Sequence, residues 1–186
     1  MHEEMNFLHK NNTYKLVELP KGKKTLRNKW VFKLKKDGEK LVKYKAQLVV
    51  KGFNQKQEID FDEIFSPVVK MSSIQVILGL TASLDLEFEQ MDVKIAFLHG
   101  DLEEEIYMVH PEGFEEKGKE HMVCRLKKSP YGLKQALRQW YKKFDSFMVG
   151  HGYTRIDADH CVYVRQFPNG KFIILLLYVD DMLIVG

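Results

Sequence analysis

FIILLLYVDDMLIVG, residues 172–186, sets two adjacent aspartates between two apolar runs. The runs, Lys171 to Tyr178 and Met182 to Val185, are short and rich in β-branched and aliphatic residues, and only Val179, Asp180 and Asp181 separate them. This pattern predicts two buried strands joined by a tight hairpin. A membrane span is excluded, because the stretch is shorter than the ~20 residues a spanning helix needs and carries two acids near its middle.

Two acids at the tip of an apolar hairpin need a partner. Burying a carboxylate is costly unless a cation or several hydrogen bonds compensate it, and a divalent metal ion is the natural cation for aspartate oxygens. The alternative is that Asp180 and Asp181 merely serve a turn, where aspartate is common.

A third acid, Asp92, ends a run of alternating residues. Leu86 to Val93 predicts a strand in which Phe88 and Gln90 share the face that Asp92 continues. One fold would then bring three acids to neighbouring strand ends. Taken alone, Asp92 is equally compatible with an ordinary acid at a strand end.

The remaining periodic segments predict helices and one further hairpin. Residues 2–10 predict a short helix with Met5 and Leu8 buried, ending at Asn11 and Asn12. Two strands, residues 30–35 and 40–50, are joined through Asp37-Gly38, a strong hairpin signal. A helix over 72–83 takes Ser72 or Ser73 as its N-cap, and another over 134–149 stops at Gly150. No repeat interrupts the chain, which reads as one continuous unit.

Charge is distributed unevenly along the chain of 186 residues. The formal net charge of +3 does not by itself indicate a nucleic-acid partner. Residues 21–56, however, hold thirteen lysines and arginines against only Asp37 and Glu39. The hydrophobic content of 45% indicates a folded chain. The isolated Cys124 and Cys161 indicate neither a zinc site nor a disulfide framework. The N-terminus lacks the pattern of a signal peptide. We therefore expect an intracellular protein, located either in a cytoplasmic particle or in the nucleus.

Seven strings, in chain order, resemble the reverse transcriptase of copia-type retrotransposon Pol polyproteins. They are KWVFKLKKDGE, YKAQLVVKGFNQ, FSPVVKMSSI, QMDVKIAFLHGDLEEEIYMVHPEGF, CRLKKSPYGLKQALRQWYKKFDSFM, GYTRIDADHCVYV and LLLYVDDMLIVG. The resemblance spans nearly the whole chain, and several long motifs in the right order are far more specific than any single tetrapeptide. It implies an RNA-directed DNA polymerase.

The resemblance assigns the acids a catalytic role. Asp92, Asp180 and Asp181 match the three catalytic aspartates of such polymerases, with the first two holding two Mg²⁺ ions, for which Mn²⁺ is a substitute, and Asp181 adding a nearby negative charge. The implied reaction is two-metal nucleotidyl transfer onto a primer 3′-hydroxyl. The implied partners are an RNA or DNA template, a primer strand and deoxynucleoside triphosphates, with no membrane, and the oligomeric state stays open.

Other residues are implied to contact nucleotide or nucleic acid. Phe97 matches the bulky side chain that blocks a ribose 2′-hydroxyl, with a core aromatic as the alternative. The residues implied to line the incoming nucleotide are Val93, Phe97, Tyr131, Gly132, Lys134 and Lys45. Those implied to contact the nucleic-acid strands are Lys43, Lys51 and Tyr178. For Lys43, Lys45 and Lys51 the alternative is a solvated charge on an edge strand. For the segment with Tyr131, Gly132 and Lys134 the alternative is an ordinary helix start.

Four residues depart from the family's usual pattern. Gln47 stands where arginine is usual and removes a guanidinium that binds phosphate in a bidentate manner. Pro130 and Leu137 stand where leucine and proline are usual, and Ile95 replaces a common threonine.

The expected architecture is an α+β right-hand polymerase fingers and palm over residues 1–186. An antiparallel palm sheet is backed by the helices at 72–83 and 134–149, and the chain is truncated after the YVDD hairpin, without thumb or RNase H. Two alternatives to the polymerase function stay open. In the first, the chain is a degenerate or truncated remnant that at most binds nucleic acid. In the second, it is a metal-dependent phosphohydrolase that uses the same acids.

Overall fold

The chain folds into two compact units, each built from two separate stretches of sequence. The structure is a computed structural model that describes residues 1–37 and 41–186, and the side chains of 1–34 and 44–186. Unit 1 comprises Met1–Ile64 and Phe97–Gln139, and unit 2 comprises Phe65–Ala96 and Trp140–Gly186. The sequence predicts one continuous unit. The division is not visible there because all three boundaries, after Ile64, Ala96 and Gln139, fall in segments of ordinary composition.

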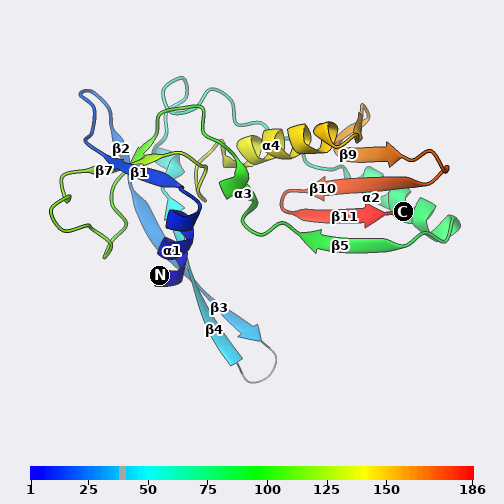
Figure 1. The fold of residues 1–186 in the computed structure, drawn as a ribbon, viewed down its shortest axis with the longest axis horizontal. Helices are drawn as coiled ribbons and strands as arrows, with labels where there is room; N and C mark the ends of the chain where they lie inside the picture. The colour runs from blue at the N-terminus through cyan, green and yellow to red at the C-terminus, as the bar shows by residue number, and fades with distance from the viewer. Residues whose placement is uncertain (38–40) are drawn as a thin grey trace. The chain divides into compact units, whose positions relative to one another are not determined.

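Unit 1 is built on a small mixed sheet and a long hairpin (Figure 1). Its elements are α1 (His2–Lys10), β1 (Tyr14–Val17), β2 (Thr25–Leu26), β3 (Asn28–Asp37), β4 (Leu41–Val50), the 3₁₀ turn η1 (Gly52–Asn54), β6 (Tyr107–Met108) and β7 (Val123–Leu126). The sheet order is β1-β7-β6-β2, antiparallel except for the β2–β6 pair. Helix α3 (Ala96–His99) straddles the boundary between the units, as does α4 (Ala136–Gly150).

The N-terminal helix is confirmed. Helix α1 covers His2–Lys10, buries Met5 and Leu8, and ends at Asn11, with Asn12 at a positive φ of 50°. Glu4 Oε1 accepts a hydrogen bond from the backbone N–H of Leu48 at 3.3 Å, which ties the helix to β4. The local apolar spacing and the two asparagines were therefore sufficient to define this element.

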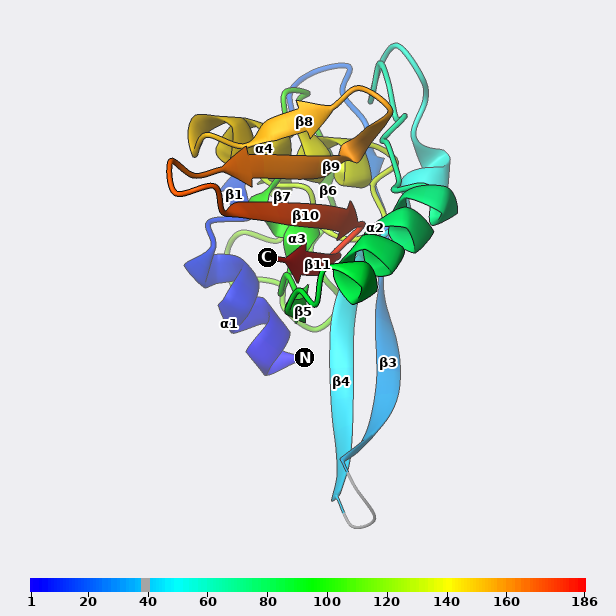
Figure 2. The ribbon, with the colours of Figure 1, turned by 90° about the vertical axis from the view of Figure 1, so that its right-hand side faces the viewer.

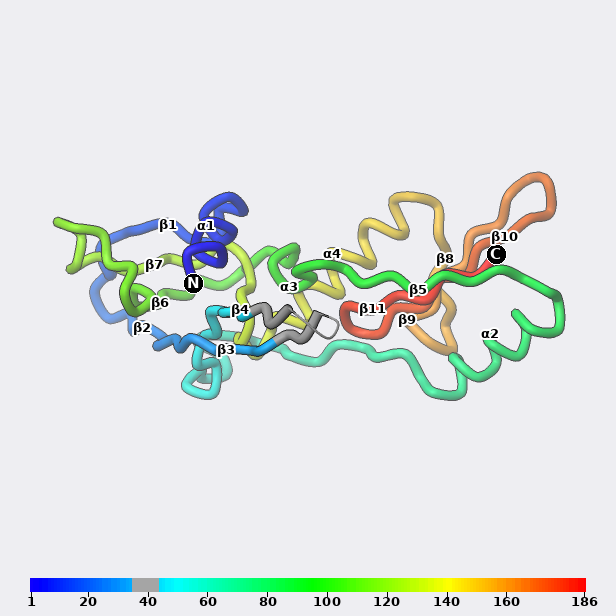
Figure 3. Tube along the Cα trace, turned by 90° about the horizontal axis from the view of Figure 1, so that it is seen from below, coloured from blue at the N-terminus to red at the C-terminus, as the bar shows by residue number. Residues whose placement is uncertain are grey.

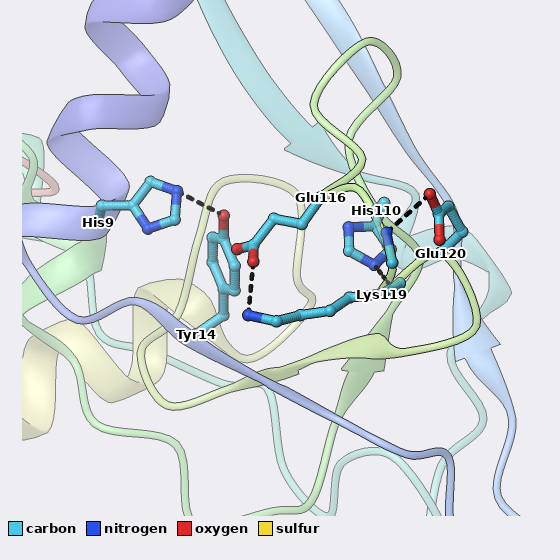
Figure 4. Close-up of polar contacts among 7 residues, drawn as sticks. His9, Tyr14, His110, Glu116, Lys119 and Glu120 are labelled. Carbon is cyan, nitrogen blue, oxygen red and sulfur yellow. Dashed lines mark hydrogen bonds and ion pairs between the residues drawn. The ribbon is translucent and has the colours of Figure 1, made fainter.

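A surface cluster of polar side chains lies between α1, β1 and the loop before β7 (Figure 4). The Tyr14 hydroxyl and His9 Nε2 lie 3.0 Å apart, and Lys119 pairs with Glu116 at 2.7 Å. Burial is the main cause that raises the pKa of Tyr14, and the negative charge of Glu116 adds to it. The phenol consequently stays protonated and contributes a neutral hydrogen bond to the packing of α1.

The predicted basic hairpin is confirmed as β3 and β4. Its antiparallel register runs from Asn28 opposite Val50 to Asp37 opposite Leu41. The predicted Asp37-Gly38 turn lies outside the described residues. Within the described side chains, Lys33 stands directly opposite Lys45, and both are exposed.

Unit 2 holds one antiparallel sheet of five strands, ordered β5-β11-β10-β9-β8 (Figures 1 and 2). Its elements are α2 (Met71–Ser83), β5 (Phe88–Asp92), β8 (Thr154–Ile156), β9 (Asp159–Gln166), β10 (Phe172–Tyr178) and β11 (Asp181–Val185). The predicted hairpin at the end of the chain and the strand that leads to Asp92 are both present. The α+β class is thereby confirmed.

The two helices of unit 2 cover opposite faces of this sheet (Figure 3). Phe144 of α4 contacts the ring of Tyr163 at 5.6 Å, and Asp145 accepts a hydrogen bond from the Tyr163 hydroxyl at 3.0 Å. On the other face, Ile74 of α2 lines a pocket together with Gln90 and Leu183. Register partners in antiparallel strands share a face, and Gln90 and Leu183 are such partners.

The start of α2 corrects one prediction. The N-cap is Lys70, without a side-chain cap, rather than Ser72 or Ser73. Asp159 at the start of β9 takes over this role, since one of its carboxylate oxygens accepts hydrogen bonds from the Lys70 N–H at 2.8 Å and from the Ser73 hydroxyl at 2.6 Å. A partner so distant in the chain could not be identified from local capping patterns.

Helix α4 also begins and ends slightly later than expected. It runs from Ala136 to Gly150, so Gly150 is its last residue rather than the residue that follows it. Trp140, Phe144 and Met148, spaced four residues apart along the helix, are buried. In the described part of the chain no helix combines the length and the apolar character needed to span a membrane.

Candidate active site

The three predicted acids lie at one end of the sheet of unit 2. Asp181, the first residue of β11, stands directly opposite Asp92, the last residue of β5, in the antiparallel register. Directly opposed residues have Cα atoms about 4.5 to 5.5 Å apart and share a face. Asp180 precedes Asp181, and its carbonyl accepts a hydrogen bond from the Val93 N–H at 2.8 Å. The backbone thus brings Asp92 beside Asp180 and Asp181.

The turn that carries the acids has an unusual backbone. Tyr178 pairs with Asp181, so Val179 and Asp180 form a two-residue connection, with Val179 at a φ of 60°. Ile95, which follows Asp92 by three residues, has a φ of 65°. A β-branched residue at positive φ is a genuine outlier, and such strain clusters at functional sites. The backbone is therefore strained at Val179, just before Asp180, and at Ile95, shortly after Asp92.

The charges of the three acids are not compensated within the described residues. Asp92 is exposed, Asp180 and Asp181 are half-buried, and no ion pair is formed by any of them there. Like charges directly opposite each other on a sheet are destabilising. A divalent cation would relieve this repulsion, and carboxylate oxygens are the ligands that Mg²⁺ prefers.

The side-chain conformations do not converge on a single point. Across the described residues, no group of three histidine, cysteine, aspartate or glutamate side chains is arranged to hold a metal ion. The donor type and the backbone positions of the three acids suit a hard divalent cation. The structure therefore supports the chemical fit of the acids to such an ion, without supplying a coordination geometry.

A pocket of about 260 Å³ lies beside Asp181 on the same face of the sheet. Val69, Ile74 and Tyr178 are among the residues that line it. Tyr178 is 53% exposed, so it is accessible at this end of the sheet.

In unit 1, the predicted nucleotide residues Phe97 and Tyr131 contact each other. Their ring centroids lie 5.1 Å apart with an interplanar angle of 84°, an edge-to-face pair. The Tyr131 carbonyl accepts a hydrogen bond from Val50 at 2.8 Å. Both residues are half-buried, so the aromatic pair lies at the edge of the core and part of it is exposed to solvent.

Gly132 is wedged against the end of β4. Its φ is 97°, and a Cβ atom there would lie 2.1 Å from the Val50 carbonyl oxygen. A Cβ at Gly52 would lie 1.9 Å from the Gly132 carbonyl oxygen. The two glycines therefore let the segment after β4 and the Tyr131-Gly132 segment meet backbone to backbone.

Sequence reasoning missed two glutamines that hold Lys134. Gln55 Oε1 accepts a hydrogen bond from the Lys134 backbone N–H at 2.9 Å, and Gln55 Nε2 donates to Gln135 Oε1 at 3.0 Å. Gln135 in turn donates to the Asp60 carbonyl at 2.9 Å. The Lys134 ammonium lies 4.8 Å from the centroid of the Phe61 ring. Both glutamines occur in the family motifs quoted above. Their role becomes visible only in the structure, where Gln55 is 4% exposed and Gln135 is 0% exposed, so their hydrogen bonds form a buried network.

The remaining predicted residues occupy several places. Lys45 lines a pocket of about 570 Å³ between α1 and β4. Lys51 follows β4 and donates its backbone N–H to the Arg27 carbonyl at 2.8 Å. The side chain of Lys43 lies outside the described residues. Val93 follows β5 and is half-buried.

Asp159 is a buried acid of unit 2 that sequence reasoning did not single out. Burial opposes its ionisation, but hydrogen bonds from Ser73, Lys70 and Cys161 outweigh burial and lower its pKa. Asp159 therefore stays ionised as a cap for α2. Burial also raises the pKa of the free thiols of Cys124 and Cys161 to about 12 in each case, so both stay protonated.

Comparisons with known proteins show the family of the chain. The family described as "Reverse transcriptase (RNA-dependent DNA polymerase)" matches residues 11–186. The "Retrovirus-related Pol polyprotein from transposon TNT 1-94" of Nicotiana tabacum is 73% identical over 187 residues, covering 100% of this chain and 14% of that protein. The chain matches no solved structure.

More distant relatives extend the match. The "Retrovirus-related Pol polyprotein from transposon RE2" of Arabidopsis thaliana is 42% identical over 100% of this chain and 13% of its own length. The "Transposon Ty1-DR5 Gag-Pol polyprotein" of Saccharomyces cerevisiae is 30% identical over 98% of this chain and 10% of its own length. The chain thus spans about a seventh, or less, of the length of these relatives. The family match and these identities show that the chain belongs to the reverse transcriptase (RNA-dependent DNA polymerase) family of copia-type retrotransposon Pol polyproteins.

Proposed function

We propose that this chain is the fingers and palm region of an RNA-directed DNA polymerase that transfers a nucleotidyl group from a deoxynucleoside triphosphate to a primer 3′-hydroxyl. The sheet of unit 2 is then the palm, and the β3–β4 hairpin belongs to the fingers. The observation that carries the proposal is the register pair of Asp92 and Asp181 with Asp180 at the adjoining turn. No other acids of unit 2 combine this placement with uncompensated charge in the described part.

The acids' role follows from their charge and position. Asp92 and Asp180 would hold two divalent cations, and Asp181 would add negative charge beside them. When bound, such ions activate the primer hydroxyl and neutralise charge on the leaving pyrophosphate. The protein contributes a fixed sheet end that presents the oxygens, and the Val93-to-Asp180 hydrogen bond keeps the two strands in register there.

Residues of both units are candidate contacts to nucleotide and nucleic acid, and the basic ones lie in unit 1. The directly opposed Lys33 and Lys45 repel each other, so a phosphate that lies between their exposed ammonium groups would be favoured. Lys43 and Lys51 extend the same basic segment along the chain. Val93, Tyr131, Gly132 and Lys134 stay assigned to the nucleotide, and Tyr178 to the nucleic-acid strand.

Primer extension tests the proposed function. The 186-residue chain is incubated with an RNA template annealed to a labelled DNA primer, the four deoxynucleotides, and Mg²⁺ or Mn²⁺. We expect template-directed lengthening of the primer. A chain that shifts the labelled hybrid on a gel but adds no nucleotide would be a non-catalytic remnant. Release of phosphate from nucleotides without a template would instead identify a phosphohydrolase.

Selection against ribonucleotides is expected to depend on Phe97. Phe97→Val removes bulk where a ribose 2′-hydroxyl would sit, so the preference for dCTP over CTP should fall by about 10- to 100-fold in kcat/KM. Phe97→Tyr, which keeps the ring, is the matched control and should retain the preference. Single-nucleotide incorporation measures both. An unchanged preference in Phe97→Val would return Phe97 to the role of a packing aromatic beside Tyr131.

A further inference from the structure

The turn between β10 and β11 needs external support. Val179 has a φ of 60° at the first position of the two-residue connection. For a β-branched residue this conformation is strained and persists only where surrounding contacts enforce it. Asp180 and Asp181 directly follow Val179, so any relaxation of this peptide would move them.

Two hydrogen bonds hold the turn, one at each of its carbonyls. The Trp140 indole Nε1–H donates to the Val179 carbonyl at 2.7 Å. The Val93 N–H donates to the Asp180 carbonyl at 2.8 Å. One bond comes from helix α4 and the other from the residue after Asp92, so the turn is fixed to two elements at once.

Trp140 is itself firmly placed. It is 5% exposed and its ring lies 5.4 Å from that of Phe144, one helical turn further along α4. A buried indole N–H needs an acceptor, and many acceptors would satisfy that need. Here the acceptor is the peptide that precedes the two acids, and that peptide is the strained one.

We propose that Trp140 is a positioning residue for the candidate catalytic acids. Its indole N–H holds the Val179–Asp180 peptide in the conformation that keeps Asp181 opposite Asp92 and Asp180 at the adjoining turn. Trp140 touches neither substrate nor metal ion in this role and acts only through the turn. The inference rests on the proposed function for the purpose assigned to the acids.

Two substitutions separate positioning from packing. Trp140→Phe removes the indole donor and keeps an aromatic ring, so Mn²⁺ affinity should fall about tenfold, and kcat for primer extension should fall by a similar factor with little change in the KM for nucleotide. Adding Val179→Gly removes the cost of the positive φ. The double variant should recover Mn²⁺ affinity to within about threefold of the parent, because glycine adopts a positive φ without strain.

Met148→Ala is the matched control, because Met148 is buried on the same helix two turns beyond Trp140 and the substitution weakens packing without removing a contact to Trp140 or to the turn. It should lower the melting temperature and leave Mn²⁺ affinity unchanged. A Trp140→Phe variant that behaves like Met148→Ala, or a double variant with no recovery, would overturn the positioning role.

Amide hydrogen exchange gives a readout that needs neither metal ions nor activity. Exchange at Asp181 and Met182 should accelerate in Trp140→Phe and slow again when Val179→Gly is added. If the parent chain extends no primer but shows these exchange changes, the proposed function fails while the role of Trp140 stands. If exchange at the turn is the same in all variants, the role of Trp140 fails whatever the activity.

Discussion

Asparagine in place of Asp180 is expected to reduce primer extension by about a thousandfold or more. Loss of one charged oxygen ligand removes several kcal/mol of stabilisation of the developing charge, and each 1.4 kcal/mol corresponds to a factor of ten. The fold should survive, because Asp180→Asn also removes one charge from a cluster of like charges. Primer extension and Mn²⁺ titration measure the two consequences, with the melting temperature as a check on folding.

The matched control for Asp180→Asn is Asp157→Asn. Asp157 is an exposed acid of unit 2 between β8 and β9, so this variant makes the same charge change away from the β10–β11 turn. It should keep the parent's activity and Mn²⁺ affinity. If Asp180→Asn retained more than a tenth of the parent's extension rate, the assignment of the acids as metal ligands would be wrong, whatever the family of the chain.

The second large effect is expected in stability, at Gly132. Gly132→Ala should destabilise the fold by about 3 to 5 kcal/mol, because the new methyl group meets the Val50 carbonyl oxygen at 2.1 Å and the residue must keep a φ of 97°. A melting temperature lower by roughly 10 °C is the corresponding shift for a chain of this size. Thermal unfolding measures it, and an unchanged melting temperature would show that β4 and the Tyr131-Gly132 segment separate freely.

Gly52 and Gly118 separate this effect into its two causes, and Gly79 is a control that has neither. Gly52 meets the Gly132 carbonyl oxygen at 1.9 Å without a positive φ, so Gly52→Ala measures the clash alone. Gly118 has a φ of 81° in open space, so Gly118→Ala measures the backbone strain alone and should cost about 1 kcal/mol. Gly79 lies inside α2 with nothing within 4 Å, and Gly79→Ala should stabilise by up to about 1 kcal/mol.

The sequence predicted those elements whose signals are local. Helix α1, the β3–β4 hairpin and the β10–β11 hairpin each combine a clear apolar pattern with turn residues within a few positions. The strands of unit 1 that were missed, β1, β2, β6 and β7, have two to four residues each and pair across long stretches of chain. Such short runs carry too little periodicity to be recognised, because their strand conformation is imposed by their partners.

In the candidate site, too, some residues could be identified from local sequence patterns and others could not. The alternating pattern of β5 and the apolar flanks of the turn were enough to single out Asp92, Asp180 and Asp181 as acids at strand ends. The buried pair Gln55 and Gln135 gave no such signal, because a glutamine in a motif looks the same whether it is solvated or enclosed. Burial is a property of what packs around a residue, and distant segments supply that packing.

The amino-acid sequence by itself determined the family and the α+β class and pointed to the three acids as candidates, because these depend on residue type and local order. Only the tertiary structure decided that Asp181 stands opposite Asp92, that the Trp140 indole holds the Val179 peptide, and that Gly52 and Gly132 meet backbone to backbone. Each of these contacts joins residues far apart in the chain. Strand register and the close approach of backbones follow from how whole elements pack, and no local pattern encodes them.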